Sequence, residues 1–274
     1  MLLKPAPLEF APGFAPRPQI THVVCDFDGT LSWLRHGWPE IMLGLFLPRI
    51  PRLPGESESG LREMLLADIY GLNGKLTLHQ MIRFAERVSE RGGLPQNPET
   101  LRQEFQASLD RDIAERIADL REGRRKPDDF VVHGARLLLE KIEARGLKLF
   151  ILSGTVTDRV CEEGGLIGLT RFFGSRIIGS QPDEPFSKLV HLEQILREER
   201  IPGANLLALG DGAVEIEAAK KLGGLAIAVA SDENHNGCGV MEPHKRRALL
   251  AAGADAVIAD YRDPDALLAA IFGG

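Results

Sequence analysis

Two aspartates spaced two residues apart are the first side chains in this sequence that could do chemistry. Asp26 and Asp28 follow the apolar run 23–25, and Gly29 and Thr30 come directly after them. Residues two apart point to the same face of an extended strand, so the two carboxylates should leave the strand end side by side. Two like charges that close raise one pKa unless a cation lies between them. The pattern indicates a divalent metal site, an anion-transfer site or both, although Asp-x-Asp-Gly also occurs in ordinary turns.

Two further sites combine polar side chains with a predicted helix start. Ser153-Gly154-Thr155 follows the predicted strand 147–152. A hydroxyl, a glycine amide and a helix N-terminus can cradle a phosphate, although an ordinary helix N-cap has the same composition. Lys188 heads another predicted helix, where a lysine opposes the helix dipole and is expected to meet an anion unless it is solvent-exposed.

A second acidic pair follows the predicted strand 206–209. Asp211 stands at the strand end, and Glu215 lies one helical turn further on the same side. Carboxylate oxygens are the ligands that Mg²⁺ prefers in proteins. A helix capping box, in which Glu215 bonds back to the loop, is the alternative interpretation.

The elements that must position these residues alternate between helix and strand. Apolar runs predict strands over 20–25, 147–152, 176–179, 206–209, 225–230 and 256–258. Helical periodicity predicts helices over 134–145, 156–164, 188–200, 214–222, 243–252 and 264–272. Fully apolar strands alternating with helices indicate an α/β fold with a parallel sheet covered on both faces. In such sheets ligands bind at the carboxyl ends of the strands.

A long helical insertion separates the first strand from the others. Helices are expected over 61–70, 98–120 and from an N-cap at Thr77 to about 91, with no convincing strand between 34 and 130. We therefore expect a catalytic core over 20–33 and 131–274, and a helical cap over 34–130 that covers the strand tips. The proline-rich residues 1–19 are expected to form an arm that is draped over the surface or disordered.

Composition limits the class of protein. The chain has 274 residues, of which 44% are hydrophobic and 26% charged, as in ordinary soluble globular proteins. A net charge of -6 argues against nucleic-acid binding, and no apolar run is long enough to span a membrane. Three scattered cysteines and the lack of a signal-peptide pattern favour a cytoplasmic protein. The sequence leaves the oligomeric state open.

The ordered motifs resemble those of the haloacid dehalogenase (HAD) superfamily. Its hydrolases carry an Asp-x-Asp-Gly-Thr motif, a Ser/Thr motif, a lysine and an acidic metal motif, which match Asp26–Thr30, Ser153, Lys188 and Asp211 here. The resemblance implies a Rossmann-like three-layer core with a C1-type helical cap. Many members carry a second aspartate in the last motif, where this chain has Glu215. We expect metal binding to persist, with Glu215 outside the ligand set or reaching a metal-bound water.

The same resemblance implies a mechanism. Asp26 would be the nucleophile that forms an aspartyl-phosphate, and Asp28 the general acid and base. Mg²⁺ would be held by the Asp26 carboxylate, the Asp28 carbonyl and Asp211, and phosphoryl oxygens by Ser153, the Gly154 amide and Lys188. These roles imply an Mg²⁺-dependent phosphatase, because dehalogenase members typically lack the second aspartate.

Substrate choice is expected to depend on the helical insertion. A closing cap favours a small phosphorylated metabolite, with sugar phosphates among the candidates. Lys75 and Arg35 are candidate substrate contacts, with surface or packing roles as the alternative. A phosphosugar mutase of the same superfamily and a non-catalytic module that binds a phosphorylated metabolite are the competing hypotheses.

Overall fold

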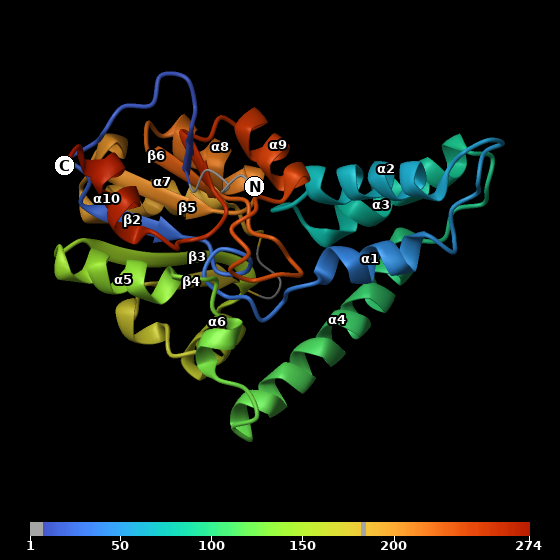
Figure 1. The fold of residues 1–274 in the computed structure, drawn as a ribbon, viewed down its shortest axis with the longest axis horizontal. Coiled ribbons are helices and arrows are strands. Elements are labelled where there is room, and N and C mark those ends of the chain that lie inside the picture. The colour runs from blue at the N-terminus through green and yellow to red at the C-terminus, as the bar shows by residue number, and fades with distance from the viewer. Residues whose placement is uncertain (1–7, 182–184) are drawn as a thin grey trace, which may run out of the picture.

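The computed structural model describes residues 8–181 and 185–274 (Figure 1). Residues 1–7, where the predicted N-terminal arm begins, lie outside this range. The strands are β1 (Leu8–Phe10), β2 (His22–Cys25), β3 (Lys148–Val156), β4 (Ile177–Ser180), β5 (Leu206–Gly210), β6 (Leu225–Val229) and β7 (Ala256–Ile258). The helices are α1 (Trp38–Phe46), α2 (Glu58–Gly71), α3 (Thr77–Glu90), α4 (Pro98–Arg121), α5 (Ala135–Ala144), α6 (Thr157–Leu166), α7 (Lys188–Glu199), α8 (Ala213–Lys221), α9 (Pro243–Ala251) and α10 (Pro264–Phe272).

The strands form one sheet in the order β1-β7-β6-β5-β2-β3-β4. Every neighbouring pair is parallel except β1 and β7. At the end of β2, Cys25 lies opposite Ile151 of β3 and Leu209 of β5. The carboxyl ends of the three central strands therefore meet at one edge of the sheet, as the sequence predicts.

Helices cover both faces of the sheet. Alternate residues of β2 point to opposite sides: Val23 packs in the cluster that includes α5 and α10, and Val24 packs against α7. Helices α8 and α9 cover the same face as α7, over β5, β6 and β7. The result is the predicted three-layer α/β core.

An edge strand, β1, is absent from the sequence-based prediction. Leu8–Phe10 pairs antiparallel with β7, and the Glu9 carboxylate accepts a 2.6 Å bond from Nε of Arg246. Three residues are too few to show an alternating pattern, so the pairing depends on the exposed edge of β7. The start of α3 also differs, because Thr77 is its first helical residue and Leu76 occupies the N-cap.

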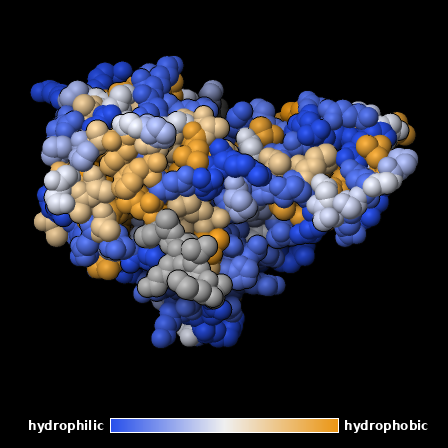
Figure 2. All heavy atoms as spheres, turned by 45° about the horizontal axis from the view of Figure 1, so that its top comes forward, coloured by the Kyte–Doolittle hydropathy of each residue, from blue (hydrophilic) through white to orange (hydrophobic). Residues whose placement is uncertain are grey.

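Helices α1–α4 have a hydrophobic cluster of their own. It contains Met42, Leu43, Phe46, Ile50, Leu61, Leu65, Ile69, Met81, Phe84, Val88, Leu101, Phe105, Leu109 and Ile113. The rings of Phe46 and Phe84 stack at 4.0 Å. Because this cluster is separate from those around the sheet, the helices pack as a second unit, which projects from the core in Figures 1 and 2.

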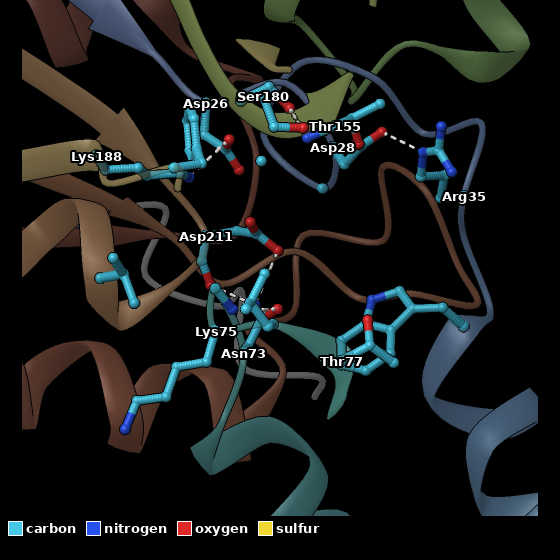
Figure 3. A pocket seen from close by; sticks show the side chains of 18 of the residues that line it. Asp26, Asp28, Arg35, Asn73, Lys75, Thr77, Thr155, Ser180, Lys188 and Asp211 are labelled. Atoms are coloured by element: carbon cyan, nitrogen blue, oxygen red, sulfur yellow. Dashed lines mark hydrogen bonds and ion pairs between the residues drawn. The ribbon is translucent and has the colours of Figure 1, made fainter. Parts of the chain in front are cut away.

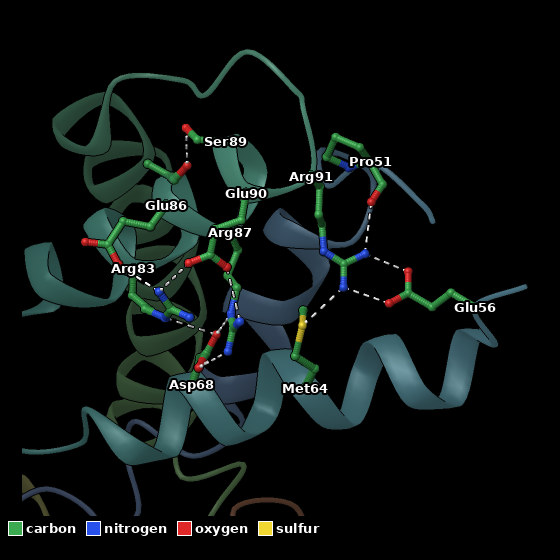
Figure 4. A network of polar contacts seen from close by, with 11 residues as sticks. Pro51, Glu56, Met64, Asp68, Arg83, Glu86, Arg87, Ser89, Glu90 and Arg91 are labelled. Carbon is green, nitrogen blue, oxygen red and sulfur yellow. Dashed lines mark hydrogen bonds and ion pairs between the residues drawn. The ribbon is translucent and has the colours of Figure 1, made fainter. Parts of the chain in front are cut away.

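Ion pairs reinforce this helical unit on its polar side (Figure 4). Arg87 of α3 donates to both oxygens of Asp68 of α2, at 2.6 and 3.1 Å. Arg91 donates to both oxygens of Glu56 and to the carbonyl of Pro51. Paired donors from a planar guanidinium fix geometry, so these contacts hold the 51–56 loop and α2 against α3.

The helical unit touches the core on two sides. On one side, Tyr70 stacks on His244 of α9 at 5.7 Å, and His244 lies 3.2 Å from Glu63. On the other, Asp110 of α4 pairs with Arg159 of α6 at 2.9 Å. Within the described part of the chain, no helix has the length and apolar character needed to cross a membrane.

Candidate active site

The two aspartates after β2 lie at the central edge of the sheet (Figure 3). Asp26 is nearly buried, whereas the Asp28 side chain keeps 23% of its surface exposed. Gly29 has φ +71°, a conformation that favours glycine. A Cβ at Gly29 would lie 2.3 Å from Oδ2 of Asp211. Because Gly29 has no side chain, the turn after β2 leaves room for the Asp211 carboxylate, which follows β5.

A buried lysine joins two of the predicted acidic residues. Nζ of Lys188 lies 2.8 Å from Oδ1 of Asp26 and 3.0 Å from Oε2 of Glu215. Burial raises the pKa of Asp26, and Lys188 only partly counteracts that effect. Burial lowers the pKa of Lys188, but the two carboxylates outweigh it and raise that pKa overall. The site therefore holds a charged lysine where the sequence predicts that an anion binds.

Both oxygens of Asp28 accept hydrogen bonds. Nε of Arg35 donates to Oδ1 at 2.9 Å, and Oγ1 of Thr155 donates to Oδ2 at 2.7 Å. The other end of the guanidinium bonds to buried Glu163 at 2.7 Å. Burial raises the pKa of Glu163 to about 7. Arg35 thus connects Asp28 to α6.

Asp211 is held by contacts from three directions. Nδ2 of Asn73, from the loop between α2 and α3, donates to the Asp211 carbonyl at 2.9 Å and to Oδ2 at 3.3 Å. Nζ of Lys245, from α9, lies 2.9 Å from the same Oδ2. The Gly29 turn packs against the carboxylate. The helical unit and the core therefore both contact this predicted metal ligand.

The Ser153 segment differs from its prediction. β3 continues to Val156 and α6 begins only at Thr157, so Ser153 lies within a strand and not at a helix start. The Ser153 hydroxyl accepts the Thr155 amide at 3.1 Å, and Gly154 is exposed. Apolar residues end at Leu152, which is why the sequence pattern ended the strand four residues early.

The carboxylates fit a small divalent cation. Oxygens of Asp26, Asp211 and Glu215 lie within 4.8 Å of one another. Hard oxygen donors in such a cluster suit Mg²⁺.

Glu215 also makes the helix cap that the sequence left as its alternative role. Its Oε1 accepts the Gly212 amide at 2.7 Å, while Oε2 faces Lys188. Both oxygens are thus engaged by the protein. Glu215 therefore adds negative charge to the cluster and fixes the first turn of α8.

A cavity of about 780 Å³ opens above these residues, between the core and the helical unit. Of the predicted site residues, it is lined by Asp26, Asp28, Arg35, Lys75, Ser153, Gly154, Lys188 and Asp211. Trp38, Thr77 and Phe105 line it from the helical unit. Lys75 is exposed, and Figure 3 shows its side chain directed away from Asp26 and Asp211.

Sequence reasoning missed three buried charged residues around this site, Lys245, Glu163 and Glu233. Lys245 belongs to a basic run, but it lies four residues before the buried Leu249 on the same face of α9. Glu163 lies three residues after the buried Val160 of α6 in the same way. The spacing of three or four residues from an apolar position, on the same face of the helix, could have predicted that the Lys245 and Glu163 side chains are buried.

One family model matches most of the chain. The family model for haloacid dehalogenase-like hydrolases matches residues 20–223. No curated protein sequence matches the chain. A haloacid dehalogenase-like protein of unknown function from Agrobacterium tumefaciens has a similar structure, with TM-score 0.63, 15% identity, and coverage of 92% of this chain and 99% of the other.

Two other similar structures have names that refer to phosphorylated compounds. A predicted phosphoglycolate phosphatase from Haemophilus somnus has TM-score 0.57 and 15% identity, with 89% and 96% of the two chains covered. CbbY from Rhodobacter sphaeroides, in complex with xylulose-1,5-bisphosphate, has TM-score 0.53 and 16% identity, with the same coverage. At these identities the similarity establishes the fold alone.

Proposed function

Because this chain belongs to the haloacid dehalogenase-like hydrolase family, we propose that it is an Mg²⁺-dependent phosphatase that hydrolyses a small phosphorylated metabolite. The observation that carries the proposal is the convergence of Asp26, Asp28, Lys188 and Asp211 on one cavity. Residues 20–33 and 131–274 form the catalytic core in this proposal, and residues 34–130 act as the cap.

Asp26 is the proposed nucleophile. Its carboxylate attacks the phosphorus atom, the bond to the leaving oxygen breaks, and an aspartyl-phosphate forms. Lys188 lies against this carboxylate, so its charge can stabilise the phosphoryl oxygens as the transfer proceeds. Ser153 and the Gly154 amide, which also line the cavity, bind the same oxygens in this scheme.

Asp28 is the proposed general acid and base. It protonates the leaving alcohol in the first step and removes a proton from water in the second. The water attacks the aspartyl-phosphate, which releases phosphate and restores Asp26. Arg35 and Thr155 hold the Asp28 carboxylate in place between these two roles.

The carboxylates of Asp26 and Asp211 and the Asp28 carbonyl would hold Mg²⁺. When bound, the ion reduces the repulsion between the Asp26 carboxylate and an incoming phosphate. Glu215 has both oxygens engaged by Gly212 and Lys188, so in this proposal it acts through charge and by holding Lys188.

The cavity supports a small substrate. The helical unit closes over the aspartates and contributes Trp38 and Phe105 to the wall. Such a lining can pack against the carbon skeleton of a metabolite, whereas a folded phosphoprotein would need an open approach. Sugar phosphates therefore come first among the esters to test.

The test is phosphate release from a panel of sugar phosphates, small phosphorylated acids and nucleoside monophosphates, with Mg²⁺ and with EDTA. We expect Mg²⁺-dependent release from a few esters and its loss in Asp26→Asn. The matched control is Asp260→Asn, a buried aspartate paired with Arg262 outside this cavity. No release from any ester would refute the hydrolase, and isomerisation without release would replace it with a mutase.

A further inference from the structure

Lys245 is a buried lysine that lies outside the motifs described above. Its side chain is fully enclosed, and Nζ lies 2.9 Å from Oδ2 of Asp211. Nζ also pairs with the buried carboxylate of Glu233 and lies 3.4 Å from the Ser231 hydroxyl. Burial of an ammonium group is costly unless partners compensate for the lost water.

The position of Lys245 in its helix points to a specific role. It lies in the first turn of α9, which begins at Pro243. A positive charge there opposes the helix dipole. Two carboxylates offset this cost, and one of them, Asp211, belongs to the proposed metal site.

The two carboxylate oxygens of Asp211 differ in their contacts. Lys245 and Asn73 both reach Oδ2. Among the described residues, neither a hydrogen bond nor an ion pair reaches Oδ1. One oxygen is thus restrained by the protein, and the other is free of such contacts among the described residues. Groups that hold a ligand in this way commonly tune metal affinity.

We propose that Lys245 is a positioning residue for the metal site, which orients Asp211 so that its Oδ1 binds Mg²⁺. This inference rests on the proposed function, because it takes Asp211 as a metal ligand. Glu233 is the counter-ion of Lys245. With it, the three side chains Lys245, Asp211 and Glu233 keep a net negative charge, which favours binding of a cation.

Lys245 should affect Mg²⁺ affinity in two opposite ways, and the sign of the measured change tests the proposal. A nearby positive charge repels a cation, so electrostatics alone predicts that removal of Lys245 strengthens Mg²⁺ binding. Loss of the restraint on Asp211 predicts the reverse. Contacts of this kind typically contribute 10–100-fold in metal affinity, and the proposal requires that the restraint outweigh the repulsion.

The experiment is isothermal titration of the metal-free full chain with Mg²⁺. We compare the unaltered protein, Lys245→Met, and Lys245→Met combined with Glu233→Gln. The second substitution removes the buried Glu233 charge that the single variant leaves unpaired, and it keeps the net charge of the unaltered protein. Lys220→Met is the matched control, because Lys220 pairs with Asp255 at 2.6 Å, away from the cluster. We expect about 10–100-fold weaker binding in both Lys245 variants and no change in the control.

Unchanged or tighter binding in a folded Lys245 variant would overturn the positioning role and leave the phosphatase proposal intact. Failure of the unaltered protein to bind Mg²⁺ would contradict the metal site itself, and both proposals with it. Because the readout is metal affinity and not turnover, these two failures are distinguishable.

Discussion

Replacement of Arg35 by methionine tests how the proposed general acid is held. Arg35 is nearly buried, with 12% of its side chain exposed, and it bonds to Asp28 on one side and to Glu163 on the other. Methionine keeps much of the length and apolar volume but removes both bonds. Asp28 then keeps the contact with Thr155 as its remaining restraint among the described residues.

The expected loss follows from the type of bond removed. A hydrogen bond between charged groups contributes about 1.5–3 kcal/mol, and the low exposure of this pair keeps solvent screening small. If the bond holds Asp28 in its reacting position, kcat should fall by about 10- to 150-fold. KM should change little, because in this arrangement the guanidinium binds Asp28 and not the substrate.

The assay is steady-state hydrolysis of the best ester from the panel, with kcat and KM measured separately. Glu163→Gln should cause a smaller loss of kcat, since the amide oxygen can still accept a bond from Arg35. Arg176→Met is the control, because the hydrogen bonds of Arg176 within the described part of the chain go to the backbone carbonyls of Leu149 and Phe172. A raised KM with unchanged kcat would refute the reasoning and favour the alternative that Arg35 contacts substrate.

Three other predictions concern stability and the metal site. Glu163 has a pKa raised by burial to about 7, so the folded state binds its proton more tightly than the unfolded state. The contribution of Glu163 to stability therefore falls as pH rises from about 4.5 to 7. Urea unfolding across this range should show this fall, and Glu163→Gln should make the slope of stability against pH less steep; an unchanged slope would contradict the burial effect. Leu65→Ala, in the core of the helical unit, should lower the free energy of unfolding by about 2–5 kcal/mol, and a loss below 1 kcal/mol on chemical denaturation would contradict this packing. Gly29→Ala combines a positive φ with a clash against Asp211, so the rise in melting temperature that Mg²⁺ gives the unaltered protein should disappear, and an undiminished rise would show that the turn tolerates a side chain.

Much of the fold could be predicted because its signals are local. The strands of the parallel sheet are apolar runs, and the helices between them carry a 3.6-residue periodicity. Since parallel strands present their carboxyl ends at one edge, Asp26 and Asp211 could be placed close together without knowledge of the side-chain contacts. β1 was not predicted, because its three residues form a strand only by pairing with β7.

The contacts of the site residues were harder to predict. Arg35 was a candidate substrate contact with a packing role as the alternative, and it bonds to Asp28 and to Glu163, which lies 128 residues away. Lys75 was a second substrate candidate, but its side chain is directed away from the aspartates (Figure 3). Both side chains line the cavity, and their contact with substrate stays a prediction.

The sequence by itself determined which residue types stand at the strand ends, and hence the kind of chemistry available. That information is local, because an apolar run followed by a carboxylate predicts a strand and the residue at its end, but not the partners of that residue. The tertiary structure decided the partners: Lys188 between Asp26 and Glu215, Arg35 on Asp28, and Lys245 and Asn73 on Asp211. Such partners come from elements far apart in the chain, and packing alone brings them within hydrogen-bond distance.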